Sequence, residues 1–195
     1  MSHSEPQRPT LTFGEFFSRH AELLQMKLEG PEVGMGRRIR EPTINRPGLA
    51  LSGFYSYFAE KRIQVIGAAE TSYLKSLSVE VARERCRALC AQPIPGLVVS
   101  RGAKPVPVLL EEAARVEIPV LRTPMVTMKF INAATLALEV DFAPTKSEYG
   151  SMVDILGVGT LIRGSSGIGK SEAVLGLVER GHSLVSDDIT RFRAM

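Results

Sequence analysis

The chain has 195 residues, of which 44% are hydrophobic and 23% charged, a balance typical of a soluble globular protein. Its net charge of +3 is small and the basic residues are scattered, so nucleic-acid binding is not expected. No apolar run approaches the roughly 20 residues of a membrane span, and the polar first ten residues do not resemble a secretion signal. We therefore expect a cytoplasmic protein that binds neither membrane nor nucleic acid.

The first 142 residues predict a small α/β domain. Thr12 and Glu15 form a capping-box pattern that begins a helix, whose apolar stripe continues to Leu28. A turn at 42–47 then precedes a short helix carrying the aromatic residues of 54–58. Three apolar strands follow, at 63–66, 97–100 and 118–121, separated by helices around 78–91 and 107–116 and followed by a helix over 125–142. Strands that alternate with helices favour a parallel sheet.

The two cysteines, Cys86 and Cys90, are four positions apart and share one face of a predicted helix. No other Cys or His lies near them in the sequence, so we expect buried free thiols and no zinc site. Ala143 and Pro144 mark a boundary between a first domain, 1–142, and a second, 143–195.

The second domain opens with the most informative motif of the chain. An apolar run at 153–162 is followed by the sequence GSSGIGKS at 164–171 and by an amphipathic helical pattern at 172–180. This order of strand, glycine-rich loop and helix is that of a P-loop, in which backbone N–H groups and a helix N-terminus face phosphate oxygens. We predict a phosphate site formed by Gly164, Ser165, Ser166, Gly167, Ile168, Gly169, Lys170 and Ser171. A glycine-rich turn without function is the alternative.

A short strand at 182–186 leads into two adjacent carboxylates, Asp187 and Asp188. Alone, such a pair is more often a solvated acidic turn. Beside a P-loop, one carboxylate can hold Mg²⁺ and the other can take a proton from an incoming hydroxyl.

Several strings together resemble one family, the bacterial HPr kinase/phosphorylases. They lie at 46–49, 53–58, 62–67, 70–74, 100–102, 118–124, 157–172 and 179–188. The resemblance implies a small parallel-sheet N-terminal domain followed by the opening β-loop-α-β unit of a P-loop kinase domain. It also implies phosphoryl transfer from ATP or pyrophosphate to a serine of the phosphocarrier protein HPr, the reverse phosphorolysis, a requirement for Mg²⁺ and assembly into hexamers.

Carried over by position, Lys170 contacts the phosphates, Ser171 and Asp188 are metal ligands, and Asp187 is the catalytic base. Tyr149 stands where the family has a histidine close to the phosphates, and tyrosine cannot become cationic as imidazole does. The family also continues well beyond the position of residue 195, so we expect this chain to be truncated and inactive alone. Two alternatives remain open at this point, a non-catalytic module that senses nucleotide or phosphate and another P-loop small-molecule kinase.

Overall fold

The computed structural model describes residues 10–193, which divide into two compact units. The N-terminal unit comprises Thr10–Phe142, and the C-terminal unit comprises the described residues from Ala143 onward. Within residues 10–193, no helix is both long and apolar enough to cross a membrane.

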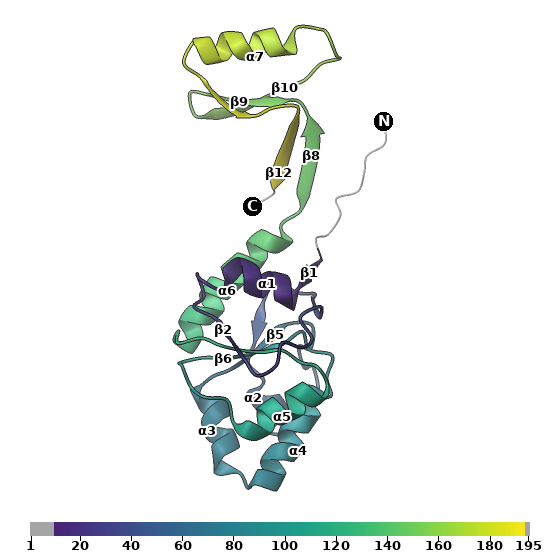
Figure 1. Cartoon of the computed structure of the whole chain (residues 1–195), viewed down its shortest axis with the longest axis vertical. Coiled ribbons are helices and arrows are strands. Elements are labelled where there is room, and N and C mark those ends of the chain that lie inside the picture. The colour runs from purple at the N-terminus through teal and green to yellow at the C-terminus, as the bar shows by residue number, and fades with distance from the viewer. Residues whose placement is uncertain (1–9, 194–195) are drawn as a thin grey trace. The chain divides into compact units, whose positions relative to one another are not determined.

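A five-stranded, mostly parallel sheet forms the centre of the N-terminal unit (Figure 1), which confirms the predicted parallel sheet, although only three of its strands were predicted. Its strands, in spatial order, are β2 (Lys27–Glu29), β7 (Val120–Arg122), β6 (Leu97–Val99), β5 (Ile63–Ile66) and β4 (Ile44–Asn45). The four strands from β4 to β7 are parallel to their neighbours, and β2 adds an antiparallel edge. A separate two-stranded ladder joins β1 (Leu11–Thr12) to β3 (Arg38–Ile39).

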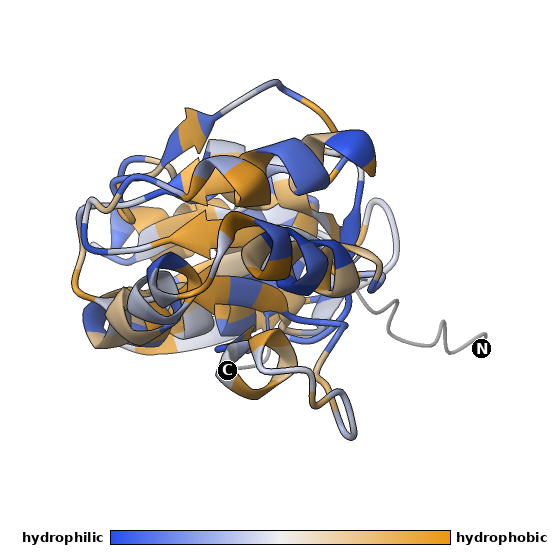
Figure 2. Cartoon of the chain, turned by 90° about the horizontal axis from the view of Figure 1, so that it is seen from below, coloured by the Kyte–Doolittle hydropathy of each residue, from blue (hydrophilic) through white to orange (hydrophobic). Residues whose placement is uncertain are grey.

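Helices cover both faces of this sheet. The helices on one face are α2 (Gly48–Leu51), α3 (Ala68–Ser76), α4 (Val79–Cys90) and α5 (Pro107–Arg115), and those on the other are α1 (Phe13–His20) and α6 (Thr127–Phe142) (Figure 1). Every residue of the inner strands β5 and β6 is buried, as in strands covered on two faces, and all but Gln64 are hydrophobic. Figure 2 shows the chain coloured by hydropathy, with its hydrophobic stretches in orange. Phe13, Phe16 and Phe130 are fully buried beside the sheet, and burying each such ring contributes roughly 1.5–3 kcal/mol.

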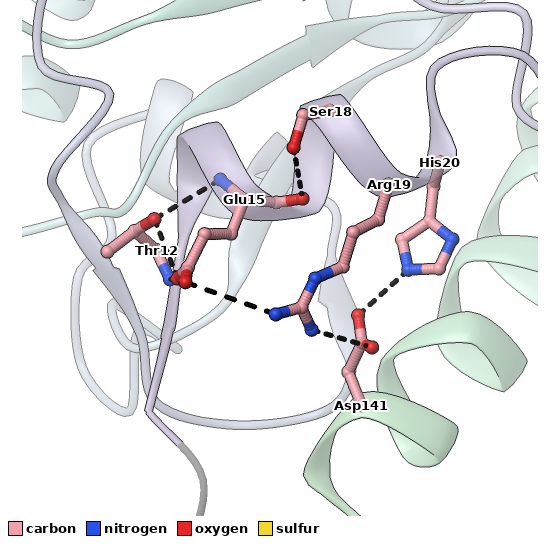
Figure 3. Close-up of polar contacts among 6 residues, drawn as sticks. All are labelled: Thr12, Glu15, Ser18, Arg19, His20 and Asp141. Atoms are coloured by element: carbon pink, nitrogen blue, oxygen red, sulfur yellow. Dashed lines mark hydrogen bonds and ion pairs between the residues drawn. The ribbon is translucent and has the colours of Figure 1, made fainter.

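Helix α1 begins at the predicted capping box and is tied to the end of α6. The Glu15 carboxylate accepts hydrogen bonds from the Thr12 backbone N–H and hydroxyl, and the Thr12 hydroxyl accepts one from the Glu15 N–H (Figure 3). Arg19 donates to Asp141 of α6 at 3.0 Å, and His20 Nε2 lies 2.8 Å from the same carboxylate. One aspartate therefore holds the last turns of two helices together.

Two helix predictions in this unit were wrong. Helix α1 ends at His20, because Leu24 is buried in the turn that follows and Leu28 continues into β2, opposite Leu121 of β7. The same apolar residues fit a helix stripe or a turn followed by a strand. The second short helix is residues 48–51, and the aromatic residues of 54–58 follow it in turns, because Gly53 has a φ of 103° and ends the helix.

A buried carboxylate joins α4 to α5. The side chain of Glu112 is 3% exposed and is surrounded by the guanidinium groups of Arg87, Arg83 and Arg115. Hydrogen bonds from Arg87 first, and then from Arg83, hold the pKa of Glu112 at about 2 in spite of its burial.

Cys86 and Cys90 are free and buried on α4, as predicted. Burial raises the pKa of each thiol to about 12, so both remain protonated at neutral pH. Among residues 10–193, no group of three or more His, Cys, Asp or Glu side chains is arranged to hold a metal ion.

The C-terminal unit contains two small antiparallel sheets and one helix. Its elements are β8 (Thr145–Tyr149), β9 (Ser151–Ile155), β10 (Val158–Ile162), α7 (Lys170–Glu179), β11 (Ser183–Ser186) and β12 (Ile189–Arg193). One sheet has the order β10-β9-β11, and the other pairs β8 with β12. The apolar run at 153–162, predicted as one strand, is a hairpin with a two-residue turn at Leu156 and Gly157. The turn was missed because the run is apolar on both sides of it.

Candidate active site

The glycine-rich motif forms a loop between β10 and α7, as a P-loop does. Gly169 is the N-cap of α7 and has a φ of 96°, and Gly167 has a φ of 78°. Side chains other than glycine rarely adopt these angles, so the two glycines allow the loop to curl back before the helix begins. Residues 163–168 are exposed. The loop thus presents its backbone at the positive end of the α7 dipole, where an anion is favoured.

The ammonium group of Lys170 lies across the start of this loop. Its Nζ donates to the carbonyl oxygens of Gly164, at 2.9 Å, and Ser165, at 2.8 Å. An ammonium group has three N–H donors, so one remains for another acceptor. The lysine is therefore held at the phosphate loop by the loop itself, with its charge only half-buried.

Asp187 and Asp188 form the turn between β11 and β12. The Oδ1 atom of Asp187 accepts two hydrogen bonds, one from the Ser151 hydroxyl at 2.6 Å and one from the Asp188 N–H at 3.0 Å. Asp188 has a φ of 60°, and its carbonyl oxygen accepts a hydrogen bond from the Gly150 N–H at 2.9 Å. Both aspartates are exposed at the surface of the unit.

Strand register brings the loop and the aspartates to one edge of the sheet. Strands β10 and β11 both run antiparallel to β9, which lies between them, so their carboxyl ends point the same way. Ile162, the last residue before the loop segment, pairs with Ser151, and Ser186, just before the aspartates, pairs with Met152. Two inter-strand spacings place the ends of β10 and β11 about 10 Å apart. The predicted β-loop-α-β order is present along the chain as β10, the loop, α7 and β11. In the sheet, β9 lies between β10 and β11.

Tyr149 and Gly150 connect β8 to β9 beside the aspartates. Tyr149 pairs with Ile189 in the β8–β12 ladder, and its side chain is 79% exposed. Gly150 is buried, and a Cβ atom there would meet the Ile162 carbonyl oxygen at 2.7 Å, closer than real contacts allow. The chain can therefore cross between the two sheets at this point only because residue 150 is glycine.

The structure brings most of the predicted site residues together around β9. Lys170, Ser171 and the glycines follow β10, Asp187 and Asp188 follow β11, and Tyr149 precedes β9. Sequence reasoning missed Ser151, whose hydroxyl contacts Asp187 across 36 positions of the chain. The one signal in the sequence was a polar residue at the start of an apolar strand. In the structure this serine is buried, with 5% exposure.

Comparison with known proteins assigns this chain to a family. The family model described as the HPr serine kinase N terminus matches residues 3–138, and that of the HPr serine kinase C-terminal domain matches residues 140–195. The chain belongs to the HPr serine kinase family. Curated proteins with the name HPr kinase/phosphorylase are 43% identical in Halalkalibacterium halodurans and 41% in an Exiguobacterium strain, each over 172 residues, and 44% in Clostridium botulinum over 170 residues.

These matches cover 87–88% of this chain and 55–56% of the relatives, so the chain spans about half the length of the curated HPr kinase/phosphorylases that it matches. The two matched family regions meet near the boundary between the two compact units. The family assignment therefore rests on both units of the chain and not on the P-loop alone.

Proposed function

We propose that this chain is part of an HPr kinase/phosphorylase that transfers a phosphoryl group from ATP or pyrophosphate to a serine of HPr and catalyses the reverse phosphorolysis. The observation that carries the proposal is the common edge of the sheet at which β10 ends in a phosphate loop and β11 ends in two carboxylates. Phosphoryl transfer depends mainly on positioning and on neutralising charge, and this edge supplies groups for both.

Each predicted residue has a role in this proposal. The backbone of residues 164–171 and the ammonium of Lys170 would hold the donor phosphates. Asp187 would accept the proton of the attacking serine hydroxyl while that oxygen bonds to phosphorus and the bond from phosphorus to the leaving phosphate oxygen breaks. Tyr149 is proposed to lie close to the phosphates, where it offers a phenol hydroxyl.

Mg²⁺ would neutralise charge on the donor phosphates, and two side chains here carry the kind of oxygen ligand that it takes. Ser171, at the first turn of α7, and Asp188, in the turn after β11, both carry oxygen donors on exposed side chains. Among the described residues, neither side chain has a hydrogen-bond partner, so both are free to act as ligands. Magnesium prefers such oxygen ligands and keeps several waters.

We further propose that the two units correspond to an N-terminal domain, 1–142, and the start of a kinase domain, 143–195, of a cytoplasmic hexamer. Exposed apolar side chains on the C-terminal unit support an assembly in which other chains or segments cover them. They include Leu175 on α7 and Leu184 and Val185 on β11, which are 58%, 47% and 63% exposed.

The test is transfer of phosphate to HPr. The 195-residue chain, and the same chain joined to the remaining C-terminal part of the Halalkalibacterium halodurans relative, would be incubated with HPr and Mg-ATP or pyrophosphate, and phosphoserine would be measured by mass spectrometry. We expect Asp187→Asn to lower the rate about 10²- to 10⁴-fold, because an amide cannot accept the serine proton, while nucleotide affinity changes only a few fold.

Asp188→Asn is the matched comparison, since it removes the neighbouring carboxylate. Loss of transfer in Asp188→Asn together with full transfer in Asp187→Asn would show that the two roles are reversed. No phosphoserine from either form of the unmutated protein, with either donor, would overturn the proposed function.

A further inference from the structure

Of the two hydrogen bonds to the carboxylate of Asp187, the candidate base, the shorter comes from the Ser151 hydroxyl. It donates to Asp187 Oδ1 at 2.6 Å, a distance typical of a hydroxyl bonded to a charged carboxylate. Ser151 is 5% exposed and begins β9, where its backbone is fixed by pairing with Ile162 of β10. The donor is therefore held by the central strand of the sheet, whereas its acceptor lies in an exposed turn.

Two donors converge on the same oxygen of Asp187. The Asp188 N–H, at 3.0 Å, shares Oδ1 with the Ser151 hydroxyl, and among the described residues Oδ2 has no hydrogen-bond donor. Two donors that hold one oxygen of a carboxylate restrict its side-chain torsions, and its second oxygen then points in one direction. The free oxygen is then the one that can accept a proton.

Further hydrogen bonds hold the residues around this contact. The Thr190 hydroxyl donates to the Gly150 carbonyl oxygen at 2.9 Å and lies 2.8 Å from the Ser186 hydroxyl, and the Gly150 N–H donates to the Asp188 carbonyl oxygen. None of these contacts reaches the Asp187 carboxylate. They fix the backbone on both sides of the turn, and within residues 10–193 only the Ser151 hydroxyl and the Asp188 N–H donate to the carboxylate itself.

We infer that Ser151 is a positioning residue that aims the Asp187 carboxylate, holding Oδ1 so that Oδ2 is presented to the hydroxyl to be phosphorylated. This inference rests on the proposed function, because it assigns Asp187 the role of the base. The serine proton goes to Oδ2, the serine oxygen forms the new bond to phosphorus, and the donor keeps the electrons of the broken bond. Ser151 keeps its own proton throughout.

The first test is kinetic and uses the form of the protein that transfers phosphate. Ser151→Ala is expected to lower kcat about 10- to 100-fold, the loss typical when a hydrogen bond that orients a functional group is removed, with KM for the donor changed less than about twofold. The decisive measurement is the same substitution in the Asp187→Asn background. If Ser151 acts only through the Asp187 carboxylate, Ser151→Ala does not lower kcat further in the Asp187→Asn background.

Thr190→Val is the matched control, because it removes a hydroxyl of equal burial that does not touch Asp187. We expect it to lower the melting temperature as Ser151→Ala does while kcat stays within about threefold of the unmutated value. Ser151→Thr, which retains the hydroxyl, should restore most of the rate. The inference would be overturned if Ser151→Ala lowered kcat by the same factor in the unmutated and the Asp187→Asn backgrounds. It would also be overturned if Thr190→Val lowered kcat as much as Ser151→Ala does.

The second test needs no turnover and therefore separates this inference from the proposed function. The χ1 rotamer of Asp187 can be measured from three-bond couplings by NMR in the 195-residue chain. A single rotamer is expected in the unmutated chain and in Thr190→Val, and an averaged one in Ser151→Ala. Failure of phosphate transfer would refute the function only, whereas an unchanged Asp187 rotamer in Ser151→Ala would refute the positioning role.

Discussion

Removal of the Lys170 ammonium should weaken phosphate binding without unfolding the loop. In the structure, Nζ uses two of its three donors on the carbonyl oxygens of Gly164 and Ser165, so a bound phosphate gains the third donor and shares or replaces the other two. The net gain is therefore close to that of one charge-assisted hydrogen bond, about 1.5–3 kcal/mol. Since 1.4 kcal/mol is a factor of ten in affinity, Lys170→Ala should raise Kd roughly 10- to 100-fold.

The assay is titration calorimetry with Mg-ATP and with pyrophosphate. Lys146→Ala is the control, because Lys146 belongs to the same unit but pairs with Glu148 at 2.6 Å, outside the P-loop. We expect Lys146→Ala to bind as the unmutated chain does and both variants to retain their circular dichroism spectra. Equal affinity of Lys170→Ala and the unmutated chain for both ligands would refute the assignment of residues 164–171 as the phosphate site.

Two further predictions concern stability. Because the arginines hold the folded-state pKa of Glu112 at about 2, below its ordinary 4.5, its stabilising contribution is complete above about pH 5 and is lost as the pH falls toward 2. In urea titrations, the difference in unfolding free energy between the unmutated chain and Glu112→Gln should therefore shrink from pH 6 to pH 3. The control is Glu84→Gln, an exposed position on α4 outside this ion cluster, and a constant difference for Glu112→Gln would contradict the prediction. Hydrogen exchange should be faster in residues 145–193 than in the N-terminal unit, because the C-terminal unit buries few apolar side chains, among them Val153 and Val174. Equal exchange rates in the two units would contradict this prediction.

Local signals in the sequence were sufficient for much of the N-terminal unit. The start of α1 could be predicted because a capping box involves residues only three positions apart. The end of α1 could not, because Leu24 and Leu28 fit a helix stripe as well as a turn followed by a strand. The strand pairing that decides between them is with Leu121, more than 90 residues away.

The candidate site also has one part that the sequence predicts and one part that it does not. The predicted phosphate loop is a contiguous segment, so its glycines and Lys170 could be found in the sequence directly. The hairpin before it was hidden, because an apolar run does not show where it turns when the turn residue Leu156 is itself apolar and 90% exposed. Without the hairpin, the strand that joins the two halves of the site cannot be recognised.

That hidden strand, β9, determines how the halves of the site meet. Its partner β10 carries the phosphate loop, its partner β11 carries the aspartates, and its first residue, Ser151, contacts Asp187. A P-loop built on adjacent parallel strands would place the carboxylates one inter-strand spacing from the loop, whereas insertion of β9 doubles this separation to about 10 Å. The wider separation leaves room at the sheet edge for both a donor phosphate and a hydroxyl group, as the proposed phosphoryl transfer to a serine needs.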